Sequence, residues 1–583
     1  MAIANPTIED IREIVKETWG YDSFRVGQEE TITPVLEGRD ALAVLPTGAG
    51  KSLIFQSLAI VLPGTMIVVS PLIALMVDQV KNANERGIKA TYINSALTDT
   101  EMATRLAGFI QGKYKLLYVA PERLNLPRFQ QACSQVVISV VAVDECHCVS
   151  RMLDYRPAYG YVDDFIAHLR KKRDVRVVAV TATATLEMEQ DIAAGCLLSP
   201  GYARIWRSPI RPEVQMSVVS NFSSPWTAIL NVIKAMDLSA RHIVYTTSRA
   251  GAEKLREMTA QSTNISPNLV AHYHAGLEPV MRAQVQKDFT DGKIRIIFST
   301  CAFGMGVDIP DIRTVVHFGI PASVEDYTQE IGRAGRDGVT SRAILVCSGP
   351  DDYSVGIRRT LITCNHPAWV TYEAVWKYLH DKMEPNTILA RSGESIAKDM
   401  ADNGYLGDAV QTEANQRGMG GSILQVLSNM EAKGLVSRSM LGAWVQVRRL
   451  ENMATADIDN VQQMRVIEWL KEQEDDSFGF DRTEAARKLA VSELIFERTI
   501  RLLVEKNCLE VDKPYKGKAT RILLYGATLA DVMSQAEIEA RHAQAMERLE
   551  IMLRYMKAPA LFGVNGDPAY RAFIESYFMG GML

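Results

Sequence analysis

The amino-acid sequence predicts an α/β protein with two parallel-sheet domains followed by a helix-rich C-terminal region. Two observations carry this prediction. Short apolar segments alternate with helical segments in two successive sets, and a glycine-rich loop lies between the first strand and the next helix. Such alternation favours a parallel sheet covered by helices on both faces. With 583 residues, 47% of them hydrophobic, the chain is long enough for several domains.

The predicted strands fall into two sets that are separated by a polar segment at residues 206–212. The first set comprises residues 41–45, 65–70, 114–120, 136–144 and 175–181, and the second comprises 242–248, 294–300, 314–319 and 341–348. We therefore expect five domains or regions. They are a first sheet domain at 1–207, a second at 208–350, a helical and winged-helix-like region at 351–455, a winged-helix domain at 456–528 and a helical pair at 529–583.

The segment from Leu45 to Ser52 has the composition of a loop that binds nucleotide phosphates. Backbone N–H groups around two of its glycines can converge on phosphate oxygens at the N-terminus of the next helix. Lys51 is then placed for the β- and γ-phosphates and Ser52 for Mg²⁺. Leu45 stands where the general pattern has glycine, so a turn without a ligand is the alternative for this segment alone. The predicted nucleotide contacts in the loop are Thr47, Gly48, Ala49, Gly50, Lys51 and Ser52.

A continuous apolar run at residues 136–143 ends in the acidic pair Asp144 and Glu145. Such a run is typical of a strand buried on both faces of a parallel sheet. Carboxylates at the C-terminal end of that strand face the ligand crevice of an α/β sheet. We expect Asp144 to hold Mg²⁺ and Glu145 to orient or deprotonate the attacking water. A purely structural pair is the alternative, although its burial is costly without a compensating cation.

The second set of strands is followed by a glycine-spaced segment that carries two arginines. Gln329, Arg333 and Arg336 recur at intervals of three or four residues, which places them on one face of a helix. An arginine that the second domain presents to a nucleotide on the first stabilises charge on the transferred γ-phosphoryl group. We therefore expect these three residues to act in catalysis. Solvated surface arginines are the alternative.

Composition narrows the class of protein further. The net charge of −5 provides no overall basic field, so nucleic-acid binding has to come from local patches. We find no basic, apolar leader and no apolar stretch long enough to cross a bilayer, so a cytoplasmic location without a membrane partner is expected. The eight cysteines form no Cys-x-x-Cys pair, and neither a disulfide framework nor zinc is expected. Cys146 and Cys148, beside the acidic pair, are expected to be small buried side chains.

Residues 19–338 resemble the helicase core of superfamily 2, and specifically the RecQ family. The resemblance rests on ordered motifs at residues 19–28, 45–52, 70–76, 118–123, 144–148, 181–184, 302–308 and 329–338. It implies two RecA-like domains and an ATP-dependent helicase that moves 3′ to 5′ on DNA. It also implies that adenine is recognised by Tyr21, Arg25 and Gln28. The DNA contacts that it implies are Ser70, Pro71, Leu72, Phe303 and Gly304.

The loop after the acidic pair departs from the family pattern. The family typically has Gln-Trp-Gly-His there, whereas this chain has Arg151, Met152 and Leu153. A base can still stack on Tyr155, Tyr159 or Arg156. An inert surface loop is the alternative.

The zinc module of the family is also missing from its usual place. Residues 351–382 contain a single cysteine, Cys364, where the family has several. Residues 548–555 and 570–578 resemble the helical pair of that module, with Ala569 where the first ligand belongs. Apolar packing is therefore expected to replace the metal. The side chains expected to be buried are Leu549, Leu553, Phe573, Tyr577 and Phe578.

Two helix-rich segments between these parts end in hairpin-like strands. In the second, an apolar helix face precedes a basic segment at residues 512–521. This order predicts a winged helix whose wing contacts phosphates and whose aromatic ring meets an unpaired base. The predicted contacts are Lys513, Tyr515, Lys516 and Lys518. A solvated hairpin is the alternative, and residues 420–449 are a second candidate wing.

Together these features predict an ATP- and Mg²⁺-dependent 3′ to 5′ DNA helicase or translocase. Its expected partners are single-stranded DNA and forked or tailed duplex. An RNA-directed or duplex-translocating ATPase that separates no strands is the alternative enzyme. An ATP-gated DNA-binding scaffold is the alternative without catalysis. The scaffold is disfavoured because a protein without catalysis need not keep the lysine, the acidic pair and both arginines.

Overall fold

The computed structural model describes most of the chain and divides it into two compact units. The first unit comprises residues 1–358 and 547–583, and the second comprises 359–546. The described residues are 3, 5–71, 73–150, 157–171, 173–304, 309–383, 389, 393–406, 416–440, 444–450, 461–473, 477–481, 485–486, 488–491, 493–506, 508–511, 518–523, 526 and 528–580.

The first unit begins with a seven-stranded parallel sheet in the order β3-β4-β2-β5-β6-β1-β7. Its strands are β1 (Ala41–Val44), β2 (Thr65–Val69), β3 (Ala90–Ile93), β4 (Leu116–Val119), β5 (Ile138–Asp144), β6 (Arg176–Thr181) and β7 (Ala203–Trp206). Its helices are α1 (Ile8–Trp19), α2 (Gln28–Leu36), α3 (Lys51–Val61), α4 (Ile73–Glu85), α5 (Asp99–Ile110), α6 (Pro127–Cys133), α7 (Val162–Arg170) and α8 (Glu189–Gly195).

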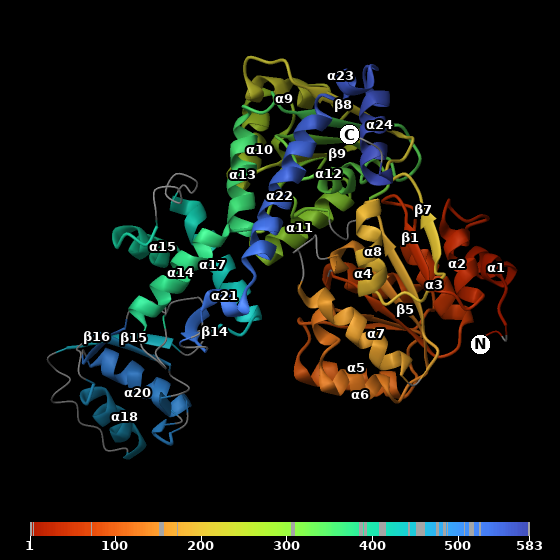
Figure 1. Ribbon diagram of the computed structural model, residues 1–583. Coiled ribbons are helices and arrows are strands. Elements are labelled where there is room, and N and C mark those ends of the chain that lie inside the picture. The colour runs from red at the N-terminus through yellow and green to blue at the C-terminus, as the bar shows by residue number, and fades with distance from the viewer. Residues whose placement is uncertain are drawn as a thin grey trace. The chain divides into compact units, whose positions relative to one another are not determined.

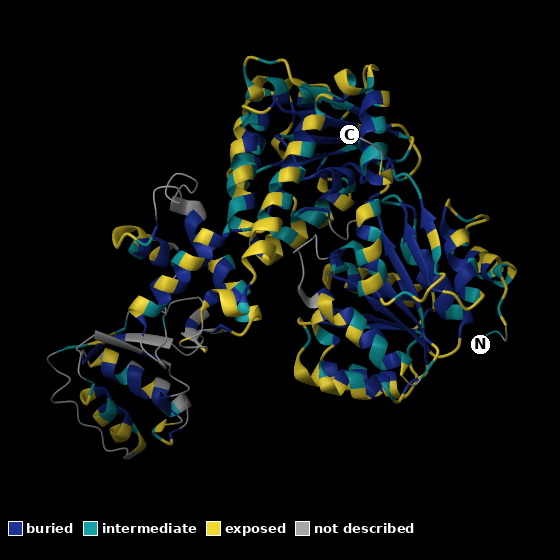
Figure 2. Cartoon of the chain, viewed as in Figure 1, coloured by how far each residue is buried: buried dark blue, intermediate teal, exposed yellow. Residues whose placement is uncertain are grey.

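Both faces of this sheet are buried beneath helices (Figures 1 and 2). Successive residues of a strand point to opposite faces, and β1 shows the result. Leu42 and Val44 lie in one apolar cluster, whereas Ala41 and Ala43 lie in the other. This double burial accounts for the continuous apolar runs in the sequence.

A second parallel sheet follows in the same unit, in the order β10-β11-β9-β12-β13-β8. Its strands are β8 (Val214–Val219), β9 (Arg241–Thr246), β10 (Val270–Tyr273), β11 (Ile296–Ser299), β12 (Ile312–Phe318) and β13 (Ser341–Val346). The helices around it are α9 (Pro225–Lys234), α10 (Arg249–Ser262), α11 (Pro279–Thr290) and α12 (Val324–Ile331). The prediction of two RecA-like α/β domains is confirmed, and the polar segment at 206–212 joins the two sheets.

The C-terminal helical pair belongs to this first unit from residue 547 onward. It consists of α22 (Gln535–Tyr555) and α24 (Asp567–Met579), with the short α23 (Ala558–Phe562) between them. Helix α24 lies against β8 (Figure 1). The Asp567 carboxylate accepts a hydrogen bond of 2.7 Å from the backbone N–H of Met216, and the Arg571 guanidinium donates one of 3.0 Å to the carbonyl of Val214. The pair is thus bound to the second sheet domain.

Apolar side chains of the pair are buried as the sequence indicated. Leu549, Leu553, Phe573 and Phe578 are all buried, and Tyr577 is partly buried. Tyr555 packs on Tyr327 of α12 with ring centroids 5.1 Å apart. These contacts give the helical pair an apolar core at the place where the zinc module of the family holds its metal ion.

The second unit contains two small antiparallel sheets and several helices. The helices are α13 (Tyr353–Asn365), which begins in the first unit, α14 (Trp369–Lys382), α15 (Gly393–Asp402), α17 (Gln416–Ala432), α18 (Val461–Lys471), α20 (Glu493–Glu505) and α21 (Leu529–Val532). The strands are β14 (Val436–Met440), β15 (Trp444–Arg449), β16 (Ser477–Asp481), β17 (Leu509–Val511) and β18 (Lys518–Ile522). Two separate apolar clusters form the cores.

The prediction that each of the two helix-rich segments in this unit ends in a hairpin is wrong. Strand β14 pairs with β18, and β15 pairs with β16 and β17, so neither β14–β15 nor β17–β18 forms a hairpin. Sequence propensity marks a segment as a strand, but burial and packing determine its partner. Residues 512–517, at the tip of the expected wing, lie outside the described residues. Among the described helices, none is long and apolar enough to cross a membrane.

Candidate functional site

The glycine-rich loop connects β1 to α3, as the sequence predicted. Gly48 and Gly50 have φ angles of 83° and 74°, a left-handed conformation that glycine adopts at little cost. Gly50 is the N-cap of α3, so the loop leads directly into a helix N-terminus. A Cβ atom on Gly50 would lie 2.6 Å from Nε2 of Gln28. The loop thus has the backbone conformation and the helix dipole that an anionic ligand requires.

Leu45, the departure from the general loop pattern, is explained by Gly27. Leu45 is fully buried, and a Cβ atom on Gly27 would lie 2.2 Å from its Cδ2 atom. Gly27 also has a φ angle of 87°. The leucine therefore packs into space that a glycine outside the loop leaves open.

Side chains that the sequence assigned to adenine recognition also hold the loop in place. The amide of Gln28 donates hydrogen bonds of 3.0 Å to the carbonyls of Ala49 and Gly50, and its Oε1 accepts one of 2.8 Å from the Arg25 N–H. The Arg25 guanidinium donates to the carbonyl of Gly48. Tyr21 is 48% exposed. The structure thus adds a supporting role for Gln28 and Arg25, and leaves the Tyr21 ring accessible.

The acidic pair lies at the end of β5, beside the glycine-rich loop. The backbone N–H of Glu145 donates to the Asp144 carboxylate over 3.0 Å. Burial, and then the negative charge of Glu145, raise the pKa of Asp144 to about 7, while Lys51 opposes the shift. Glu145 has a φ angle of 50°, which is uncommon outside glycine and costs on the order of 1 kcal/mol. Such strain is frequent at functional sites.

Lys51 faces the same acidic pair. Burial lowers the pKa of its ammonium group, and the charges of Glu145 and Asp144 partly restore it. Its Nζ atom lies 3.4 Å from the carbonyl oxygen of Leu45. With the half-buried Ser52 following it on α3, this arrangement places a cation and a hydroxyl where the sequence expected them.

A hydroxyl from the neighbouring strand joins this group. The Oγ1 atom of Thr181, at the end of β6, lies 2.6 Å from Nδ1 of His147 and 3.4 Å from the Glu145 carboxylate. Burial lowers the pKa of His147. Sequence reasoning assigned no site role to Thr181. Its position at the C-terminal end of a predicted strand was the available signal.

The second sheet domain contributes arginines to the loop. A Cβ atom on Gly48 would lie 3.3 Å from Cγ of Arg336 and 3.8 Å from Cζ of Arg211. Arg211 donates hydrogen bonds of 2.6 and 3.1 Å to the carbonyls of Gly335 and Gly332. Burial, and then the charge of Arg336, lower the pKa of Arg211 to about 10. Arg211, which the sequence analysis missed, thus supports the segment that carries Arg336.

Arg333 and Gln329 are placed differently from Arg336. Arg333 is 6% exposed and donates to the carbonyl of Gly304 in its own domain. Gln329 is partly buried near the end of α12. Of the three residues assigned to catalysis in this segment, we can place only Arg336 against the phosphate loop.

The candidate DNA contacts are only partly described. The hydroxyl of Ser70 is 3.5 Å from the Asp144 carboxylate, and Pro71 is buried. Phe303 is 1% exposed and packs on Tyr273 and Phe289 with centroid distances of 5.0 and 5.5 Å, so any contact that Phe303 itself makes with DNA in this conformation has to involve its backbone. Residues outside the described part are Leu72, Tyr155, Arg156, Lys513, Tyr515 and Lys516. Of Lys518, only the backbone in β18 is described.

The position of Tyr159 contradicts the prediction that a base can stack on its ring. It is 1% exposed, and its hydroxyl donates a hydrogen bond of 2.9 Å to the carbonyl of Asp144. The ring is therefore part of the support of the acidic pair and cannot stack on a base in this conformation. The side chains of Cys146 and Cys148 are buried, as predicted.

Two protein-family models match the first unit. The model described as DEAD/DEAH box helicase matches residues 25–192, and the one described as helicase conserved C-terminal domain matches residues 225–338. The matched regions lie within the two sheet domains. They include the phosphate loop, the acidic pair and the arginine segment.

Curated relatives are similar to this chain over more than half of its length. "ATP-dependent DNA helicase RecQ" of Haemophilus influenzae is 37% identical over 342 residues, which cover 58% of this chain and 54% of that protein. "Probable ATP-dependent DNA helicase RecS" of Bacillus subtilis is 38% identical over 350 residues, covering 59% of this chain and 68% of that protein. "Putative ATP-dependent RNA helicase R290" of Acanthamoeba polyphaga mimivirus is 35% identical over 340 residues, covering 57% and 59%. The chain spans little more than half of the RecQ relative.

Solved structures agree on the fold. The crystal structure of the DUF1998 helicase MrfA bound to DNA and AMPPNP covers 62% of this chain and 53% of its own, with a TM-score of 0.50 and 19% sequence identity. At that identity the likeness concerns the fold alone. The sequence relatives, among them the RecS protein of which this chain covers 68%, and the two matching family models show that the chain belongs to the RecQ-like family of superfamily 2 helicases.

Proposed function

We propose that this protein is an ATP- and Mg²⁺-dependent DNA helicase that moves 3′ to 5′ along single-stranded DNA and separates duplex strands. The relatives named RecQ and RecS are described as DNA helicases, and each is similar to more than half of this chain. A cytoplasmic location remains part of the same proposal.

The observation that carries this proposal is the meeting of four charged side chains at the phosphate loop. The electrostatic influence of Asp144, Glu145 and Arg336 on the pKa of Lys51 reflects their proximity. Lys51 and Arg336 supply positive charge for the phosphates, and Glu145 supplies a base for the attacking water. Arg336 comes from the second domain, so its contribution depends on closure of the two domains.

The residues also fit a divalent cation. A carboxylate whose pKa is raised by burial and by a neighbouring carboxylate is stabilised in its charged form by an added cation. Asp144 and the hydroxyl of Ser52 would hold Mg²⁺, the hard cation that prefers oxygen ligands. Bound there, Mg²⁺ neutralises phosphate charge during transfer.

Two hydroxyl groups support coupling between nucleic acid and hydrolysis. Ser70 contacts Asp144, and Thr181 contacts both His147 and Glu145. Ser70 belongs to a segment assigned to DNA by resemblance. A shift of that segment on DNA binding would act directly on the acidic pair, which offers a route that does not need the shortened loop at 151–156.

RNA is the second candidate substrate, because one relative is named as an RNA helicase. The deciding experiment is strand displacement with ATP and Mg²⁺ on matched duplexes that carry a 3′ DNA tail, a 5′ DNA tail or a 3′ RNA tail. We expect displacement from the 3′ DNA tail only. Equal or greater displacement from the RNA tail would favour the alternative enzyme, and displacement from the 5′ tail would refute the polarity.

Phosphate release measured on the same substrates separates the remaining alternatives. DNA-stimulated release without strand displacement would identify a translocating ATPase. DNA binding that responds to ATP without any release would identify a scaffold. The Lys51→Ala variant is the control, because release that persists in this variant arises from another enzyme.

A further inference from the structure

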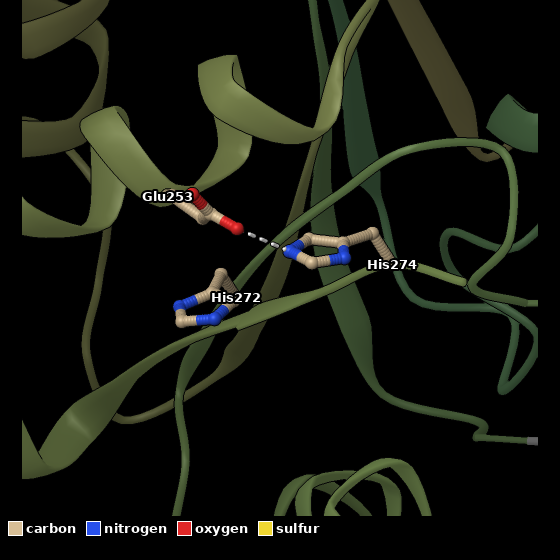
Figure 3. A group of neighbouring side chains, drawn as sticks. All are labelled: Glu253, His272 and His274. Atoms are coloured by element: carbon tan, nitrogen blue, oxygen red, sulfur yellow. Dashed lines mark hydrogen bonds and ion pairs between the residues drawn. The ribbon is translucent and has the colours of Figure 1, made fainter. Parts of the chain in front are cut away.

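A carboxylate and two imidazoles meet in the second sheet domain, outside the nucleotide site. Glu253 lies on α10, His272 lies in β10, and His274 follows the end of that strand. Figure 3 shows the three side chains turned toward one another. One potential ligand atom from each lies within 4.8 Å of the other two, and no other group of this kind occurs among the described residues.

The local fold explains why these residues meet. His272 and His274 are two positions apart, so an extended chain directs them to the same face. Helix α10 packs on β10 and brings Glu253 to that face. Nε2 of His274 lies 2.9 Å from Oε1 of Glu253, and the two imidazole rings stack with centroids 5.4 Å apart. The cluster therefore joins a strand to the helix that covers it.

The burial of His274 and the exposure of Glu253 suit a set of metal ligands. The side chain of His274 is 5% exposed, whereas that of Glu253 is 54% exposed, so one ligand is fixed and another is accessible from solvent.

We propose that Glu253, His272 and His274 form a binding site for a divalent transition-metal ion of the zinc class. Two imidazoles and one carboxylate are an established donor set for Zn²⁺, with water in the fourth position. Bonds of about 2.0–2.2 Å in a tetrahedron place ligand atoms about 3.4 Å apart. Rotation of the exposed Glu253 side chain and small movements of the rings bring the atoms from their present spacing to that one.

The surroundings of His274 predict moderate affinity. Its Nδ1 atom is buried and has no hydrogen-bond partner among the described residues. Metal-binding histidines normally donate from their second nitrogen to an acceptor, and loss of such a partner weakens binding 10- to 100-fold. The site is therefore exchangeable, and a chelator removes its ion.

An ion at this site would brace the neighbouring aromatic contacts. Tyr273 lies between the two histidines, and its ring packs on Phe303 with centroids 5.0 Å apart. Phe303 begins the segment that the family resemblance assigns to DNA. The expectation of no zinc rested on cysteine spacing and on the missing ligands of the family's zinc module. Neither bears on a set of two histidines and a glutamate.

The test is metal binding by the untagged full-length protein after treatment with a chelator. Zn²⁺ content is measured by equilibrium dialysis with elemental analysis, and Co²⁺ is used as a visible absorption probe, both without nucleotide. We expect one ion per chain and a Zn²⁺-dependent rise in unfolding temperature. His272→Gln and Glu253→Gln are expected to weaken binding at least tenfold and to abolish the thermal shift.

Glu257→Gln is the matched control, because Glu257 is exposed one turn further along α10. It is expected to bind Zn²⁺ like the parent protein. Absence of Zn²⁺ binding by the parent protein, or unchanged affinity in both site variants, would overturn the proposal. Neither result depends on ATP hydrolysis, so failure of this site would leave the proposed helicase function intact.

Discussion

In the proposed nucleotide site, burial raises the pKa of the Asp144 carboxyl group, and this shift makes the stability of the protein depend on pH. Its raised pKa, about 7, means that the folded protein holds a proton that the unfolded chain releases near pH 3.9. Protonation therefore stabilises the metal-free fold. That contribution is complete below about pH 4 and is lost as the pH rises through 7.

Asp144→Asn tests this linkage, because the amide carries no charge at any pH. Without nucleotide or Mg²⁺, we expect the variant and the parent protein to unfold at similar temperatures at about pH 4, where little of the contribution has been lost. The variant is expected to be the more stable by several degrees at pH 8.5. Thermal unfolding at the two values measures the difference. A constant difference across this range would show that Asp144 is charged throughout.

Arg336 is the residue of the second domain that we propose to act on the phosphates, because its side chain lies beside Gly48 of the phosphate loop. Arg336→Ala is expected to leave ATP affinity within several-fold and to reduce DNA-stimulated turnover by about 10³-fold, since the group acts on charge that develops during transfer. Steady-state phosphate release and equilibrium nucleotide binding separate the two effects. Arg342→Ala, at an exposed position in β13, serves as the control. A large loss of ATP affinity with normal turnover would contradict the assignment.

The local parts of this site were predictable, and its long-range supports were not. The phosphate loop and the acidic pair are contiguous in sequence, so their chemistry follows from short motifs and from the strands that precede them. Thr181 is separated from Glu145 by 36 positions, and Arg211 from Gly335 by 124. Their roles depend on tertiary contacts that no local spacing encodes.

Strands also divide into those that the local sequence identifies and those that depend on tertiary contacts. In the two parallel sheets, the four strands that the sequence analysis missed are all edge strands, namely β3, β7, β8 and β10. An edge strand has one neighbour and is less completely covered, so it lacks the continuous apolar run that identified the central strands. The expected hairpins failed for a related reason, because propensity does not determine which strands pair.

The C-terminal helical pair depends on its apolar face. Leu553 is 6% exposed in α22, and Leu553→Ala is expected to destabilise the protein by about 2–5 kcal/mol through lost burial and a residual cavity. Denaturant unfolding followed by tryptophan fluorescence measures the change. Leu561→Ala is the matched control, since Leu561 is 55% exposed and its loss is expected to cost less than about 0.5 kcal/mol. Equal effects of the two changes would exclude core packing by this face.

For the whole molecule, the proposed DNA affinity has to arise from local basic segments, because the net charge is −5. Replacement of Lys513, Lys516 and Lys518 by alanine is expected to weaken DNA binding. It is also expected to reduce the slope of log affinity against log salt by about 2 to 3, at roughly 0.9 per phosphate contact on duplex DNA. Fluorescence anisotropy on tailed duplexes over a salt series measures both.

Three exposed lysines of the sheet domains, Lys113, Lys171 and Lys287, provide the matched control. Their joint replacement changes the net charge equally and is expected to leave the slope nearly unchanged. If both triple variants show the same slope, the basic segment at 512–521 makes no specific phosphate contacts. This segment would then be solvated and without a role in DNA binding, which is the alternative given in the sequence analysis.

The central claim is that the acidic pair hydrolyses ATP in response to DNA. The most direct measurement compares ATP binding with DNA-stimulated phosphate release in the parent protein and in Glu145→Gln. We expect the variant to bind ATP with nearly unchanged affinity, because Lys51 and Asp144 remain, and to lose almost all phosphate release, because the base is absent. Undiminished phosphate release by Glu145→Gln would contradict the account.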